Sequence, residues 1–190
     1  MFAPFLFARI FMGMERKLLT CSLQQASELA VLAEKTFREA FEAMNDPVDF
    51  QHYINQAFNE EQIRKELSTK ASEFHLLYQD TFPAGYFKTN VFQAQTDIRD
   101  SEGMELERIY VLSEYQGKGH GRYMLQAAKE QARNQDKTYL WLGVWKENTE
   151  AVRFYRENGF EIFGEHPYYI GKDRQMDWLM RCDLVNLPGN

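Results

Sequence analysis

Cysteine is scarce in this chain of 190 residues, and positive charge is not in excess. The two cysteines, Cys21 and Cys182, are far apart and show no CxxC or Cys/His ligand spacing. That pattern argues against a disulfide framework and a zinc site, so we expect no metal and a reducing, cytoplasmic environment. The 22 lysines and arginines are outnumbered by 28 acidic residues, which gives a net charge of −6. Because phosphate backbones are bound by clustered Lys and Arg, we do not expect nucleic acid as a partner.

The chain also lacks a long uninterrupted apolar run. Its first residues, MFAPFLFARIFMGMERK, are apolar, but Arg9 interrupts them and no basic stretch precedes them. They therefore predict neither a signal peptide nor a membrane span, and no membrane partner is expected. We expect residues 1–13 to form an apolar arm packed on the domain or on the second subunit of a homodimer, unless Met14 is the effective start. No repeat or Pro/Ser-rich linker is present, which predicts one domain over residues 1–190 with its core in 14–184.

Apolar residues make up 44% of the chain, which is ample material for a packed core. Two helical patterns come early: one begins at a capping box of Ser22 and Gln25, the other at Asp46 and Pro47. The second helix either continues through EEQIRKEL or breaks at Asn59. The remaining patterns predict strands at 16–22, 72–80, 82–90, 104–113, 138–145, 160–166 and 174–184, and helices at 122–135 and 148–158.

This order of elements predicts an α/β fold, with a mixed sheet of about seven strands and helices on its faces. The strands at 72–80 and 82–90 are expected to form an antiparallel hairpin. The two later strand–helix–strand units should be right-handed crossovers, which leaves parallel strands in the middle of an otherwise antiparallel sheet.

The glycine-rich stretch QGKGHG, residues 116–121, lies between a predicted strand and a predicted helix. Glycine lets a ligand approach the main chain, and the first N–H groups of a helix attract anions, so the stretch has the features of a phosphate cradle. It could equally be a tight turn. Its GxGxG spacing fits neither the GxGxxG dinucleotide fingerprint nor the GxxxxGK loop of Walker-type proteins.

Two stretches resemble the signatures of the GNAT acetyltransferases. QGKGHG is similar to the acyl-CoA loop (Q/R)xxGx(G/A), and NTEAVRFYRENGF at 148–160 is similar to NxxAxxFYxxxGF. They occur in the family's order, and the element order over residues 14–184 is similar as well, most of all to the PaiA-like spermidine/spermine acetyltransferases. The resemblance implies the GNAT fold, acetyl-CoA as co-substrate, and direct attack on the acetyl group by a primary amine in a ternary complex.

The resemblance also implies where acetyl-CoA binds. The backbone of Ile109, Tyr110 and Val111 would pair with the pantetheine arm, and one N–H there would stabilise negative charge developing on the acetyl oxygen. The pyrophosphate would lie on the N–H groups of Gln116, Gly117, Lys118, Gly119, His120, Gly121 and Arg122. The side chains of Lys118 and Arg122 either add positive charge there or are solvated surface cations. His120 stands where the family more often has an aliphatic residue.

The resemblance of the second signature implies two further cofactor-binding residues and a catalytic one. Asn148 would hydrogen-bond the pantetheine amides, although a plain helix N-cap explains it equally well. Ala151 lies on the same helix face as Tyr155 and would lie beside the cofactor. The resemblance assigns Tyr155 the role of protonating the departing CoA thiolate, whereas a core tyrosine is the structural alternative.

An alkylamine with a pKa of about 10 is almost fully protonated at neutral pH, so something must accept its proton. Glu107, on the strand at 104–113, is our candidate for that base, and Glu105 lies two residues back on the same face. Both could instead be solvated or paired with Arg108 or Lys88.

The acidic run TDIRDSEGMELE supplies carboxylates at Asp97, Asp100 and Glu102 as well as at the strand. Such a cluster would attract a polycation, which favours a polyamine such as spermidine or spermine as the acceptor. Another small amine or a protein N-terminus is the alternative within the same chemistry. A non-catalytic protein that only binds acyl-CoA and regulates is the alternative of another class.

Overall fold

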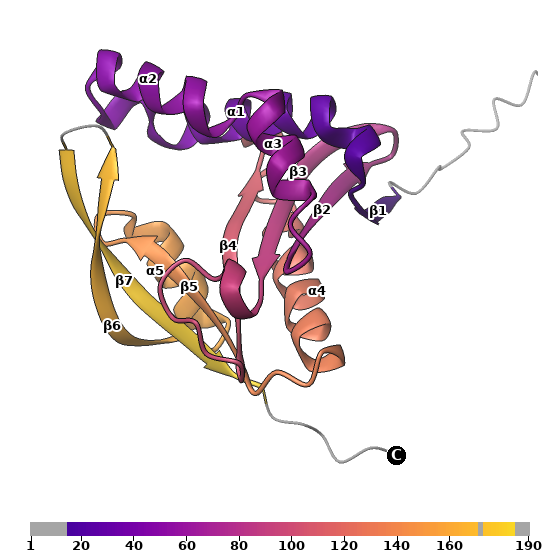
Figure 1. Ribbon diagram of the computed structural model, residues 1–190, viewed down its shortest axis with the longest axis vertical. Coiled ribbons are helices and arrows are strands. Elements are labelled where there is room, and N and C mark those ends of the chain that lie inside the picture. The colour runs from indigo at the N-terminus through magenta and orange to yellow at the C-terminus, as the bar shows by residue number, and fades with distance from the viewer. Residues whose placement is uncertain (1–14, 171–172, 185–190) are drawn as a thin grey trace, which may run out of the picture.

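A computed structural model describes residues 15–170 and 173–184 (Figure 1). Seven strands form one sheet in the order β1-β2-β3-β4-β5-β7-β6. The strands are β1 (Arg16–Thr20), β2 (Ser72–Gln79), β3 (Phe82–Asn90), β4 (Gly103–Val111), β5 (Tyr139–Trp145), β6 (Glu161–Ile170) and β7 (Asp173–Asp183). The α-helices are α1 (Ala26–Phe41), α2 (Pro47–Ala57), α3 (Glu60–Leu67), α4 (His120–Asn134) and α5 (Thr149–Glu157).

The early helices begin where the sequence predicts. Ser22 and Gln25 form the capping box, and a 3-10 turn at Leu23–Gln25 leads into α1. The Asp46 side chain accepts from the first N–H groups of α2, with Pro47 in its first turn. The second helical pattern breaks at Asn59, one of the two predicted alternatives. Asn59 caps a separate helix, α3.

Helices cover both faces of the sheet, and each face has its own core. On one face α4 and α5 bury Met124, Leu125 and Tyr155 against β4, β5 and β7. On the other face α1, α2 and α3 pack on β2 to β4 around Phe37, whose ring lies 5.0 Å from that of Phe58 between centroids. The α/β architecture with helices on both faces is confirmed.

The sheet contains a single parallel pair among the described strands, β4 with β5. Only three residue pairs join these strands, and the last is Glu105 with Trp141. Beyond that pair β5 turns away from β4 toward the hairpin of β6 and β7 (Figure 1). The unit β5–α5–β6 forms no second parallel pair, because β7 lies between β5 and β6 and is antiparallel to both.

A bulge interrupts β4 next to this divergence. Lys88 pairs with Arg108 and Thr89 with Leu106, so Glu107 is the extra residue in β4. As a result Glu107 and Arg108 both contact groups on the side of the sheet that α3 covers, where Arg108 meets Glu66.

Cys21 and Cys182 are both free thiols. Among the described helices none is long and apolar enough to cross a membrane. The arm predicted at residues 1–13, and the homodimer inferred from it, lie outside the described residues.

Candidate active site

The glycine-rich stretch folds as a tight loop that runs directly into α4. Gly117 and Gly119 have φ angles of 72° and 81°, a left-handed conformation that favours glycine over residues with a Cβ. The helix begins at His120, two residues earlier than predicted, so part of the motif lies in its first turn. The N-cap residue is Gly119, and no described side chain caps α4, so its first N–H groups stay available to a ligand at the positive end of the helix.

Two polar side chains of the loop hold the loop itself. The Gln116 amide donates to the Val111 carbonyl at 3.0 Å, and the Lys118 ammonium donates to the Glu114 carbonyl at 2.7 Å. Lys118 also lies over the Tyr115 ring. Arg122 is exposed. An anion at this loop would therefore be held first by its backbone.

His120 is buried beneath the loop, with 3% of its surface exposed. Its ring packs edge-on against Tyr115, and neither ring nitrogen has a hydrogen-bond partner among the described residues. Burial, together with the charges of Arg16 and Lys118, lowers the pKa of the His120 imidazole. The side chain is thus neutral near neutral pH and adds no positive charge to the loop.

Arg16 is a cation at this loop that the sequence reasoning did not select. Its guanidinium lies 3.8 Å from the position that a Cβ on Gly119 would occupy, and its Cζ is 5.4 Å from the centre of the Tyr123 ring. The residue comes from β1, at the sheet edge and far from the motif in sequence. No local pattern marks it, because its position depends on how β1 pairs with β2.

Asn148 acts as the N-cap of α5, which confirms the structural reading of this residue. Its Oδ1 accepts from the Ala151 N–H at 3.1 Å. Its amide nitrogen has no partner among the described residues, so it remains free to donate to a ligand. Ala151 is half-buried and packs against the core that α4 and α5 share.

Tyr155 lies in the core beneath α5, with 9% of its surface exposed. Its ring contacts those of Phe154 and Phe160. Phe154 in turn faces Gly121 of the loop, at 3.7 Å from the position of a Cβ there, so α5 and the start of α4 are in contact. Burial raises the pKa of Tyr155, which keeps its phenol protonated over the physiological range. The hydroxyl has no hydrogen-bond partner in the described part of the chain.

The strand residues Ile109, Tyr110 and Val111 pair on one side only. They pair with β3 at Phe87, Tyr86 and Gly85, whereas β5 has already turned away. Ile109 and Val111 pack on the α4 and α5 face and Tyr110 on the opposite one. The backbone groups that point toward β5 meet no strand there, which leaves an open edge for an extended ligand.

Glu107 lies among cations and amides. Its carboxylate is 2.6 Å from Lys88 Nζ and 3.2 Å from an Arg108 nitrogen, and it accepts from Asn90 at 2.5 Å. Glu105 accepts from the same Asn90 amide at 2.9 Å, so the two glutamates share a face as predicted. Burial raises the pKa of Glu105, although hydrogen bonds from Thr96 and Asn90 oppose that effect.

The hairpin of β6 and β7 reaches across to the early helices on this same side (Figure 1). The hydroxyls of Tyr53 in α2 and Tyr168 in β6 lie 2.5 Å apart. Gln175 in β7 donates to Asn45, just before α2, at 3.1 Å. The divergence of β4 and β5 is therefore bounded by α2 at one end and by the hairpin along its side.

The comparison with known families agrees with this geometry. A model of the acetyltransferase (GNAT) family matches residues 33–160, which include the loop and the whole of the second signature. The chain belongs to the GNAT acetyltransferase family. The GNAT fold predicted from the two signatures is thus confirmed, with the open edge of β4 lying between them.

Individual relatives of this GNAT chain differ in what their names report. An uncharacterised N-acetyltransferase of Lactobacillus delbrueckii is 36% identical over 169 residues, 89% of this chain and 98% of that one. A spermine/spermidine N(1)-acetyltransferase of Bacillus subtilis is 28% identical over 90 residues, 47% of this chain and 59% of that one. A crystal structure of the PaiA N-acetyltransferase of Thermoplasma acidophilum in complex with coenzyme A superimposes with a TM-score of 0.73 at 18% identity. It covers 90% of this chain and 99% of that one, and it supports the fold alone.

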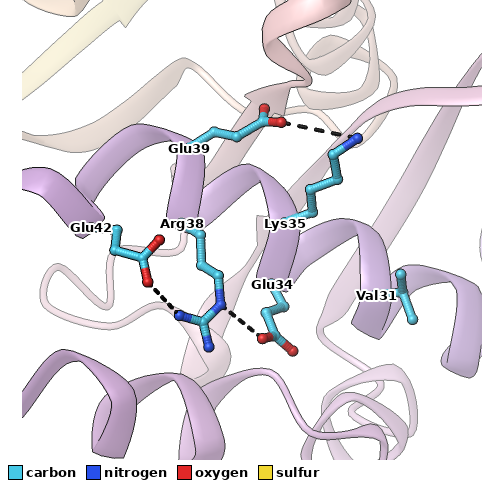
Figure 2. Close-up of a pocket in the computed structure, with 6 residues that line it drawn as sticks. All are labelled: Val31, Glu34, Lys35, Arg38, Glu39 and Glu42. Atoms are coloured by element: carbon cyan, nitrogen blue, oxygen red, sulfur yellow. Dashed lines mark hydrogen bonds and ion pairs between the residues drawn. The ribbon is translucent and has the colours of Figure 1, made fainter. Parts of the chain in front are cut away.

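A shallow hollow of about 380 Å³ lies elsewhere, on the exposed face of α1 (Figure 2). Ion pairs join Arg38 to Glu34 and to Glu42 across it. It is lined by Val31, Glu34, Lys35, Arg38, Glu39 and Glu42. None of the GNAT signature residues lines it, so it is not the acetyl-transfer site.

Within the described residues, no group of three or more His, Cys, Asp or Glu side chains is arranged to hold a metal ion.

Proposed function

We propose that this GNAT acetyltransferase moves the acetyl group of acetyl-CoA to a primary amine in a ternary complex, and that the amine belongs to a polyamine. The observation that carries the proposal is the open edge of β4 at residues 109–111. It lies between the uncapped start of α4 and the helix α5 that bears Tyr155. A thioester lying along that edge would have its phosphates and its sulfur beside those two helices.

The residues at the edge fit acetyl-CoA in distinct ways. The N–H groups of residues 116–122 would hold the pyrophosphate, with Arg16 adding positive charge beside Gly119. The backbone of residues 109–111 and the free amide of Asn148 would bind the pantetheine arm, with Ala151 beside it. Acetyl-CoA is thus a co-substrate held largely by main-chain groups.

Tyr155 is the proposed acid, and Glu107 is the proposed base. The Tyr155 phenol is protonated and has no hydrogen-bond partner among the described residues, so it can give a proton to a leaving thiolate. Glu107 faces the acceptor side, but two cations hold its carboxylate, so it would act through a water molecule.

The polyamine assignment depends on charge. Carboxylates at Asp97, Asp177, Glu105 and Glu107 lie on the face that α2 and the β6–β7 hairpin enclose. Groups of this sign would hold the ammonium groups of a polycation beyond the one that reacts. The name of the Bacillus subtilis relative supports the same substrate class.

The cytoplasmic location expected from the cysteine count is also a proposal, and it suits an enzyme with two free thiols.

A thiol-release assay with acetyl-CoA tests the proposal directly. The acceptors are spermidine, spermine, butylamine and a short peptide with a free N-terminus. We expect release with all small amines and the highest kcat/KM with the two polyamines. A higher kcat/KM with the peptide would show that the acceptor is a protein N-terminus and not a polyamine. Binding of acetyl-CoA without thiol release on any acceptor would identify a non-catalytic regulatory protein.

A further inference from the structure

We propose that His166, oriented by Asp97, is a catalytic base that accepts the amine proton across the divergence of β4 and β5, and that Asp177 holds the ammonium beside it. The proposal rests on the acetyl transfer proposed above. It assigns a role to three residues that lie outside both sequence signatures.

The imidazole of His166 is held by carboxylates on two sides. Its Nδ1 lies 2.6 Å from Asp97 Oδ2, and its Nε2 lies 3.7 Å from Asp177 Oδ2. A carboxylate at Nδ1 favours the tautomer that carries its proton there, which leaves a lone pair on Nε2. The distance to Asp177 is too long for a direct hydrogen bond, so Nε2 is free to accept from a donor that contacts both atoms from the side.

The Nε2 atom of His166 lies next to Gly143, a position of β5 that has no side chain. A Cβ on Gly143 would be 3.4 Å from Nε2 and 3.5 Å from Asp177 Oδ2, so both groups cover the only position of β5 without a side chain. Gly143 comes two residues after Trp141, the last partner of β4. If β4 and β5 continued to pair in the same register, Gly143 would lie opposite Glu107. Because His166 lies over Gly143, it is on the other side of the divergence from the β4 bulge at Glu107.

The connection between β3 and β4 shows that these groups share one side of the sheet. Along three successive residues of this connection, Gln95 accepts from Trp141 of β5 at 2.7 Å, Thr96 donates to Glu105 of β4, and Asp97 contacts His166. The same short segment thus touches both strands of the divergence and the proposed base.

The carboxylate of Asp177 includes an oxygen that can still accept a hydrogen bond. Its Oδ1 is buried and has no hydrogen-bond partner in the described residues. Burial raises the pKa of Asp177, and the contact with His166 opposes that effect. The charged groups that face the imidazole are Asp97 and Asp177, and the facing position on β5 is Gly143. This environment attracts an ammonium, whereas the carboxylate of Glu107 is already paired with Lys88 and Arg108.

These residues account for the protons that the amine loses and for the one that the sulfur gains. His166 Nε2 takes one proton from the ammonium and passes it to solvent, which its 23% exposed side chain can reach. The freed lone pair forms the C–N bond as the C–S bond breaks. The nitrogen then loses its second proton through water to Glu107, the base proposed above, while Tyr155 donates one proton to the sulfur and regains one from solvent.

The test uses His166→Gln, which keeps a polar side chain but cannot act as a base, together with Asp97→Asn. We expect kcat to fall by about 100-fold in His166→Gln, a typical loss for a general base. The KM for acetyl-CoA should be unchanged, and Asp97→Asn should lower kcat by about 10-fold.

His52→Gln is the matched control, because His52 is an exposed histidine on α2 whose replacement should leave the rate intact. Added imidazole should partly restore His166→Ala, an outcome that a purely structural role would not give. The proposal is overturned if wild type turns over but both variants keep its rate. If His166→Gln fails to fold, as judged by thermal unfolding, Asp97→Asn decides alone. Absence of turnover by wild type would overturn the proposed function itself, which is a separate result.

Discussion

The two halves of this site are built in different ways. The half proposed for acetyl-CoA consists of backbone: two glycines with positive φ, an uncapped helix start and an unpaired strand edge. The half proposed for the amine consists of side chains from the β3–β4 connection, β4, β6 and β7. A backbone site needs only a short local motif, whereas a side-chain site can change its substrate without altering the fold.

Replacing Tyr155 by Phe, at the junction of the two halves, should have the largest effect. The ring would still fill its core position, since the hydroxyl has no partner among the described residues, so stability should change little. We expect kcat to fall by about 100-fold with both KM values nearly unchanged, because only the proton donor is lost. Steady-state thiol release measures this, and unaltered turnover would remove the acid role from Tyr155.

Replacing Gly119 by Ala should damage the backbone half. The φ of 81° costs a residue with a Cβ about 1–2 kcal/mol, so we expect lower thermal stability and a KM for acetyl-CoA raised by about 10-fold. Gly121→Ala is the control for stability, because that glycine has an ordinary φ and a Cβ there meets Phe154 only at 3.7 Å. Equal unfolding temperatures for the two variants would contradict this account of the loop.

Replacing Arg16 by Gln tests the cation that β1 contributes. Because exposed charge pairs are weak and screened by salt, we expect the KM for acetyl-CoA to rise only about threefold, and the difference to shrink at high salt. Lys17→Gln, the adjacent exposed position on β1, should behave as wild type. A salt-independent effect, or an equal effect of Lys17→Gln, would argue that Arg16 acts through folding.

The smallest effect should appear in the acid stability of the side-chain half. Burial works to raise the pKa of Glu66, but Arg108 and Lys88 outweigh it and hold the pKa below its usual value. Glu66 therefore stabilises the fold above its unfolded-state pKa of about 4.3, and this contribution is lost as the pH falls through the folded value. Urea unfolding between pH 7 and pH 3 should show a weaker pH dependence in Glu66→Gln. An identical slope would mean that these ion pairs contribute nothing to acid stability.

Sequence alone predicted the backbone half and most of the fold. The loop, the cap at Asn148 and the position of Tyr155 follow from short motifs, and the helix starts follow from capping residues. The early start of α4 was missed because the loop's last residues, His120 and Gly121, suit both a turn and a helix.

The side-chain half could not be predicted in the same way. His166 and Asp177 meet only because β6 pairs with β7, and Asp97 reaches them only because the β3–β4 connection crosses β5. The insertion of β7 between β5 and β6 has no local sequence signal either. The acidic run predicted Asp97 near the proposed acceptor side, but nothing in it indicated the histidine that Asp97 contacts.

The position of β7 also constrains when the enzyme can become active during synthesis. Both of its sheet neighbours, β5 and β6, precede it in the chain, so neither can complete its pairing until residues 173–183 have left the ribosome. The glycine loop and α4 can form earlier, since they depend on local contacts. A nascent chain would thus acquire the parts that hold the acyl donor before those that hold the acceptor.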